Sequence, residues 1–88
     1  MEKEEITKQL KKERYNSVYS WKDKPNKIYK NHFHNTETKL IIMKGEIQIT
    51  TGGVTKNCES GESIIIIKKG KHSAVVGSEG CEYMVGEK

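Results

Sequence analysis

The 88-residue chain has few of the features that mark several common protein classes. No apolar run approaches the roughly 20 residues that a membrane-spanning helix needs, so we expect no membrane partner. Residues 1–14 are charged throughout and lack the apolar stretch of a secretory signal. With only two cysteines, Cys58 and Cys81, and no C-x-x-C spacing, a disulfide scaffold is excluded. We therefore expect reduced thiols and a cytoplasmic protein.

Aromatic residues are also scarce, which bears on the positive charge of the chain. There are 16 Lys and Arg against 12 Asp and Glu, a net charge of +4. Nucleic-acid-binding barrels interleave cations with aromatic side chains, because phosphates attract cations and bases stack on rings. Here the lysines are scattered, and the only tight basic cluster, Lys68, Lys69 and Lys71, surrounds Gly70 as in a turn. We interpret the lysines as a solvated surface and expect no nucleic-acid partner.

A chain of this length forms one small domain with a thin core. Residues from Glu2 to about Arg14 are mostly strong helix formers, and Ile6 and Leu10 lie four apart on one face. Acidic residues come early and basic residues late, which suits the helix dipole. We therefore assign residues 1–16 to an N-terminal helix and residues 17–88 to the main domain.

From Ser17 onward the periodicity changes from helical to extended. Glu46–Thr50 alternates between polar and apolar residues, the pattern of a half-buried strand. Ile64–Ile67 has the composition of a strand that is covered on both faces. Turn signals such as Thr51-Gly52-Gly53 separate the extended runs. The sequence thus predicts eight short strands, near residues 18–21, 27–34, 39–43, 46–50, 54–58, 64–67, 73–76 and 81–85.

Short strands with regularly spaced turns predict an antiparallel sandwich or barrel. No helical pattern separates these strands, which disfavours a doubly wound α/β fold. A thin core and an open sheet edge both favour pairing of two copies, since a bare edge strand is a liability. We therefore expect an all-β domain that forms a homodimer.

The histidines are placed as metal ligands would be. His32 and His34 flank Phe33 in an extended run, so both imidazoles point to the same face of a strand. That spacing suits two adjacent ligands of one ion. His72 follows a turn and begins another strand, which in a barrel can lie beside the first. The alternative is that each is an ordinary surface histidine or a hydrogen-bonded core histidine.

The spacing of these histidines and of several glycines resembles the cupin superfamily. The first cupin motif, G-x5-H-x-H-x3-E-x6-G with x4 as an alternative to x3, runs here from Asn26, in the place of its first glycine, through His32 and His34 to Gly45. The second motif, G-x5-P-x-G-x2-H, runs from Gly61 to His72; Ile67 takes the place of its proline, and Gly70 stands one residue late.

The resemblance covers about residues 17–86 and is nearest to small single-domain cupins of undefined function. It includes the entry segment Trp21-Lys22-Asp23-Lys24-Pro25 and the segment from His72 to Gly77. It implies a small jelly-roll-like antiparallel β-barrel with a short N-terminal α-helix.

The resemblance further implies that His32, His34 and His72 hold one divalent ion in the barrel mouth. Zn, Ni, Mn, Fe and Cu all accept such ligands. The family's glutamate ligand falls at Thr38 in this chain, and Glu37 stands one residue too early unless a β-bulge re-aims it. Glu37 is an additional candidate ligand, and the alternative for it is a solvated turn residue.

Two functions follow, and the sequence leaves open whether the protein is an enzyme. In the first, the ion binds or activates a small molecule. In the second, the barrel is a metal-free module that senses a small molecule or binds a partner. No nucleophile elbow, phosphate-binding loop or dinucleotide fingerprint is present. No free carboxylate besides Glu37 is evident for acid–base work, so any reaction would depend on the ion.

Overall fold

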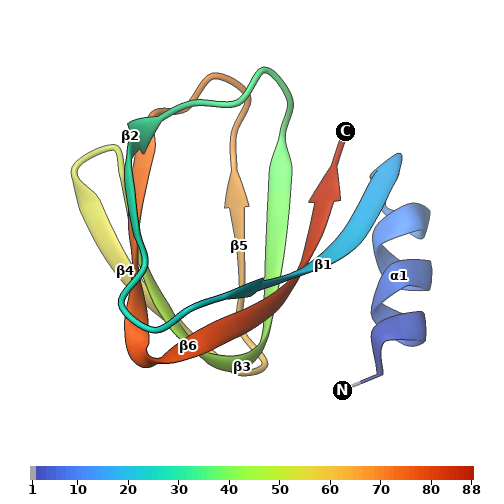
Figure 1. Cartoon of the computed structure of the whole chain (residues 1–88). Coiled ribbons are helices and arrows are strands. Elements are labelled where there is room, and N and C mark those ends of the chain that lie inside the picture. Colours follow the sequence, from blue (N-terminus) through green and yellow to red (C-terminus); the bar gives the residue numbers. More distant parts are fainter. Residues whose placement is uncertain (1) are drawn as a thin grey trace.

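The computed structural model describes residues 2–88 as one helix and six strands (Figure 1). This confirms the predicted all-β fold with an N-terminal helix. None of the described residues belongs to a helix that is long and apolar enough to cross a membrane. The elements in chain order are α1 (Lys3–Lys12), β1 (Ser17–Asp23), β2 (Ile28–His32), β3 (Thr38–Thr51), β4 (Val54–Glu59), β5 (Ser63–Ile66) and β6 (His72–Glu87).

Two long, bent strands replace four of the predicted short ones. β3 joins the predicted strands at 39–43 and 46–50, and β6 joins those at 73–76 and 81–85. Gly45 and Gly80 lie inside these strands, between the runs predicted as separate, at φ angles of +75° and +82°. A Cβ atom on Gly45 would lie 2.0 Å from the carbonyl oxygen of Gly80. The two strands therefore touch and bend together at a point that only glycine fits.

The bend folds one antiparallel sheet into two facing halves. The strand order is β1-β6-β3-β4, with β2 added to β6 and β5 added to β3. The first half of β6 pairs with β2 and the end of β3, whereas its second half pairs with β1 and the start of β3. Among residues 2–88, no ladder joins the outer strands to one another, so the sheet stays open. The expected β-barrel is therefore corrected to a folded, open sheet.

Apolar side chains occupy both faces of this sheet. The inner cluster contains Ile42, Ile47, Ile49 and Val76, together with both free cysteines. On the outer face, Ile6 and Leu10 of α1 pack against Met84. Strand alternation explains the division, because the neighbours of Met84 in β6 belong to the inner cluster. Figure 1 shows α1 beside β1, at the C-terminal end of β6.

Candidate metal centre

The inner face of the folded sheet surrounds a cavity of about 240 Å³. A water molecule occupies about 30 Å³ in the liquid, so the cavity has room for a small molecule. Most of its wall is aliphatic, and aromatic rings from β1, β2 and β6 and the three histidines complete it. The aliphatic residues are Leu40, Ile47, Ile49, Ile66, Ala74 and Val85, and the aromatic ones are Tyr19, Trp21, Tyr29 and Tyr83.

All three histidines meet on this wall. His32 ends β2 and is the register partner of His72, the first residue of β6, so their side chains lie side by side. Their ring centroids are 4.3 Å apart, and the ring of His34 lies 5.2 Å from each. One ring nitrogen from each residue lies within 4.8 Å of the other two. Residues about 40 positions apart in the sequence are therefore brought together as predicted.

Backbone carbonyls orient two of these imidazoles. The Nδ1 atom of His32 lies 2.6 Å from the carbonyl oxygen of Lys30, and Nδ1 of His72 lies 3.0 Å from that of Gly70. A carbonyl oxygen only accepts, so Nδ1 carries the hydrogen and Nε2 is left for another partner. Burial lowers the pKa of His72, the hydrogen bond to the Gly70 carbonyl opposes that shift, and the neighbouring His32 and His34 add to it. A neutral imidazole with a free Nε2 is the form that binds a metal ion.

Glu37 lies outside the histidine group. Its carboxylate accepts a 2.6 Å hydrogen bond from the Tyr15 hydroxyl, and Lys88 Nζ lies 3.4 Å away. The hydrogen bond from Tyr15 is the main cause that lowers the pKa of Glu37, and Lys88 adds to it. No bulge turns the side chain inward, because Thr38 already begins the regular alternation of β3. Glu37 therefore ties the sheet to the segment after α1 instead of joining the three histidines.

Thr38 takes the inward position that Glu37 lacks. Its side chain lines the cavity, and the residue is 4% exposed. Its Oγ1 atom is fully buried and has no hydrogen-bond partner among the described residues. Such an atom is rare in a folded protein and marks this part of the cavity wall, where Thr38 pairs with Ile66 and Glu87, as a place for another polar group.

A buried carboxylate that the sequence reasoning missed lies under the aromatic wall. Asp23 is 7% exposed and accepts hydrogen bonds from Trp21 Nε1 at 3.0 Å and from the hydroxyls of Tyr29 and Tyr83. Burial and the hydrogen bond to Asp23 raise the pKa of both phenols, so both stay protonated. The Trp-x-Asp spacing was a usable signal, because residues two apart in a strand share a face.

Comparison with known proteins bears on the fold. No protein-family model matches the sequence, and no curated protein does. A cupin-2 domain protein from Shewanella frigidimarina superposes with a TM-score of 0.67 at 25% identity, over 77% of this chain and 65% of that one. This chain has the cupin fold. The resemblance deduced from the histidine and glycine spacing is thereby confirmed.

Two enzymes share the fold of this cupin at lower identity. A variant of oxalate decarboxylase from Bacillus subtilis superposes with a TM-score of 0.74 at 20% identity, over 81% of this chain and 20% of that one. The DMSP lyase DddQ from Ruegeria pomeroyi has a TM-score of 0.74 at 17% identity, over 81% of this chain and 36% of that one. This chain spans about two thirds of the length of the cupin-2 domain protein and less of the two enzymes.

Proposed function

We propose that this cupin holds one divalent ion between His32, His34 and His72 and uses it to bind a small molecule in the cavity. The convergence of the three imidazoles on the cavity wall carries this proposal. In tetrahedral geometry, Zn–N bonds of about 2.0–2.1 Å set ligand nitrogens about 3.3–3.4 Å apart. Nitrogens that lie within 4.8 Å of one another need only small side-chain rotations to reach that spacing. Two of the three are already oriented by carbonyls, as metal-binding histidines commonly are.

An ion bound there supplies a Lewis acid that polarises a ligand oxygen or lowers the pKa of a bound water. The rest of the site comes from the chain. The aliphatic wall excludes water from the bound molecule and strengthens polar contacts inside the cavity. The hydroxyls of Tyr29 and Tyr83 donate to Asp23, which leaves their oxygen lone pairs as acceptors for a ligand's hydrogen-bond donor. By name, two structures of the same fold are a lyase and a decarboxylase, which supports conversion of the ligand as the enzymatic form of this proposal.

A metal-free module that binds a small molecule or a partner protein is the second candidate. The mostly aliphatic wall would suit a ligand bound without metal. In that case the three histidines are ordinary pocket residues that hydrogen-bond the ligand.

Elemental analysis of the untagged protein after reconstitution with Zn²⁺, Ni²⁺, Mn²⁺ or Fe²⁺ separates the two candidates. We expect one equivalent of metal in the wild type and in Asn35→Ala, an exposed neighbour that serves as the control. His32→Ala, His34→Ala and His72→Ala should each lower the metal affinity at least about tenfold, because each removes one ligand. A wild type that takes up no metal, or a His34→Ala variant with unchanged metal content, would reject the ion site in favour of the metal-free module.

A further inference from the structure

Four aromatic rings form one part of the cavity wall. Tyr19 and Trp21 lie two apart on β1, so their side chains share a face, and Trp21 is the register partner of Tyr83 in β6. Tyr29 of β2 lines the same cavity. Tyr19 and Trp21 are 40% and 51% exposed, so both rings keep surface that a bound molecule can cover.

Asp23 makes three of these rings more attractive to positive charge. The hydroxyls of Tyr29 and Tyr83 and the indole N–H of Trp21 all donate hydrogen bonds to its carboxylate. A ring that donates to a carboxylate is polarised toward negative charge, which strengthens the attraction between its face and a cation. The ring of Tyr29 already attracts one cation, because Nζ of the exposed Lys27 lies 5.5 Å from its centroid.

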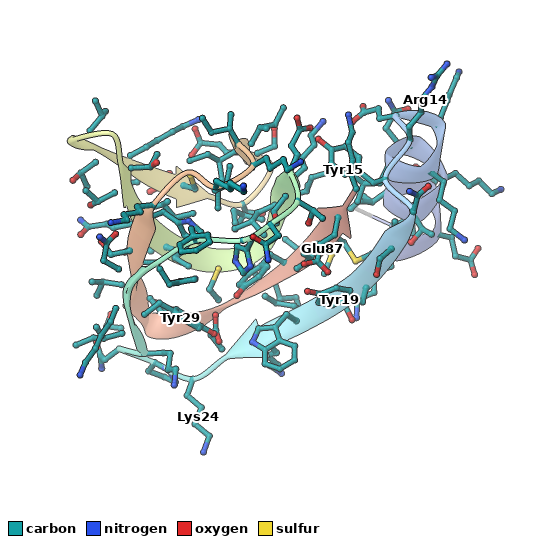
Figure 2. All side chains as sticks on the ribbon, turned by 90° about the horizontal axis from the view of Figure 1, so that it is seen from above. Arg14, Tyr15, Tyr19, Lys24, Tyr29 and Glu87 are labelled. Carbon is teal, nitrogen blue, oxygen red and sulfur yellow. The ribbon has the colours of Figure 1, made fainter. Side chains whose placement is uncertain are left out.

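Glu87 adds a negative charge at the same wall. It lines the cavity near the end of β6, beside Tyr19 of β1 (Figure 2). Burial is the main cause that raises the pKa of Tyr19, and the negative charge of Glu87 adds to it. Among residues 2–88, no lysine or arginine lines the cavity, and neither Glu87 nor Asp23 belongs to an ion pair. The charge on this side of the cavity is therefore negative and lacks a cationic partner.

We propose that the aromatic wall and Glu87 bind the quaternary ammonium head group of a small organic cation. The methyl groups of such a head group contact the rings, and its charge is attracted by the ring faces and by the carboxylates of Glu87 and Asp23. An uncharged ligand would leave both carboxylates without a cation, and an anion would be repelled by them.

The head group and the histidines occupy different parts of the cavity wall. Tyr19 and Glu87 belong to β1 and to the C-terminal end of β6, whereas His32 ends β2 and His72 begins β6. The inference rests on the proposed function for the cavity as a ligand site and makes no use of the ion. A test on metal-free protein therefore separates the failure of one proposal from the failure of the other.

The experiment titrates the protein with choline in the presence of EDTA and follows the fluorescence of Trp21, the sole tryptophan of the chain. The control ligand is the neutral analogue of choline in which a carbon atom replaces the charged nitrogen. The variants are Tyr19→Leu, which removes the ring and keeps an apolar side chain, Tyr19→Phe, which keeps the ring, and Glu87→Gln. Glu79→Gln is the matched control, because Glu79 is an exposed residue of β6 that does not line the cavity.

We expect choline to change the fluorescence in a saturable manner and its neutral analogue to bind at least about tenfold more weakly. Tyr19→Leu and Glu87→Gln should each weaken choline binding about fivefold, the effect of losing one cation–π contact or one charge pair. Tyr19→Phe should stay within about twofold of the wild type, because the ring is retained, and Glu79→Gln should match the wild type.

Three results would overturn the inference. A wild type without a saturable response to choline has no site for the head group. Equal affinities for choline and its neutral analogue show that the wall selects apolar shape and not positive charge. Unchanged affinity in both Tyr19→Leu and Glu87→Gln, with circular dichroism showing that both variants are folded, places the choline on another surface. The metal content is measured independently, so a protein that takes up no metal and still binds choline rejects the ion site alone.

Discussion

At the scale of the residue, the site depends on which side chains of a strand point inward. His72 and Thr38 do so by regular pairing of their strands, His32 does so after a register shift between Tyr29 and His32, and Glu37 lies outside that pattern. The one-residue offset of Glu37 was visible in the sequence, but its partner Tyr15 was not. Tyr15 and Glu37 are 22 positions apart in the sequence, and their side chains meet only when α1 packs on the sheet.

Glu37→Gln tests this assignment. We expect unchanged metal content, since Glu37 does not join the histidines. We also expect a lower thermal midpoint at pH 7, because the charged acceptor for Tyr15 and the ion pair with Lys88 are lost. The folded-state pKa of Glu37 lies below 4.5, so its contribution is present above that pH and lost as the pH falls through the folded value. Thermal melts should therefore show the wild-type advantage shrinking below pH 4.5; an advantage that is independent of pH, or a loss of metal, contradicts the assignment.

At the scale of the element, the bend shared by β3 and β6 builds the cavity. A strand of 14 residues and another of 16 run side by side and are in contact at Gly45 and Gly80, and each contributes to both halves of the sheet. The bend is what turns the histidine end of β6 toward the wall formed by the start of β3. Without it, the inner residues would lie on one flat, open face.

Gly45→Ala should disrupt the bend that β3 and β6 share. The new Cβ would overlap the carbonyl oxygen of Gly80, a backbone atom that cannot move aside, at a φ angle of +75°. We expect a loss of at least about 3 kcal/mol in the free energy of unfolding, or no folded protein. Gly52→Ala is the control, with a φ angle of +58° and open space around the new atom, and should cost only about 1 kcal/mol. Urea denaturation of both variants gives the comparison, and equal losses would show that the contact with Gly80 is unimportant.

At the scale of the whole molecule, one helix covers part of the outer surface and leaves the rest bare. α1 packs on β1 and β6 near Met84. The other half of the sheet exposes Ile28 and Val75, which are register partners on β2 and β6 and are 65% and 45% exposed. We propose that two copies of the chain pair through this bare face, which would bury apolar surface that a small domain cannot cover alone.

Sedimentation equilibrium tests this pairing. We expect a dimer for the wild type and a monomer for Ile28→Lys, because a buried unpaired charge opposes association. Val54→Lys is the control, since Val54 is 67% exposed but lies at the β3–β4 hairpin, away from this face. A monomeric wild type contradicts the proposal, and a dimer that survives Ile28→Lys moves the contact to another surface.

The sequence by itself determined the fold class, the helix and the three candidate ligands. Each depends on local periodicity or on spacing within a motif, and both are properties of the sequence that do not depend on which distant segments meet. Only the tertiary structure decided that eight predicted strands are six, because the contact between Gly45 and Gly80 joins residues 35 positions apart. It also decided that Asp23 accepts hydrogen bonds from Tyr29 and Tyr83. Glu37 likewise accepts one from Tyr15, and the Thr38 hydroxyl has no partner among the described residues. These are pairings between distant segments, and their geometry exists only after the sheet has folded on itself.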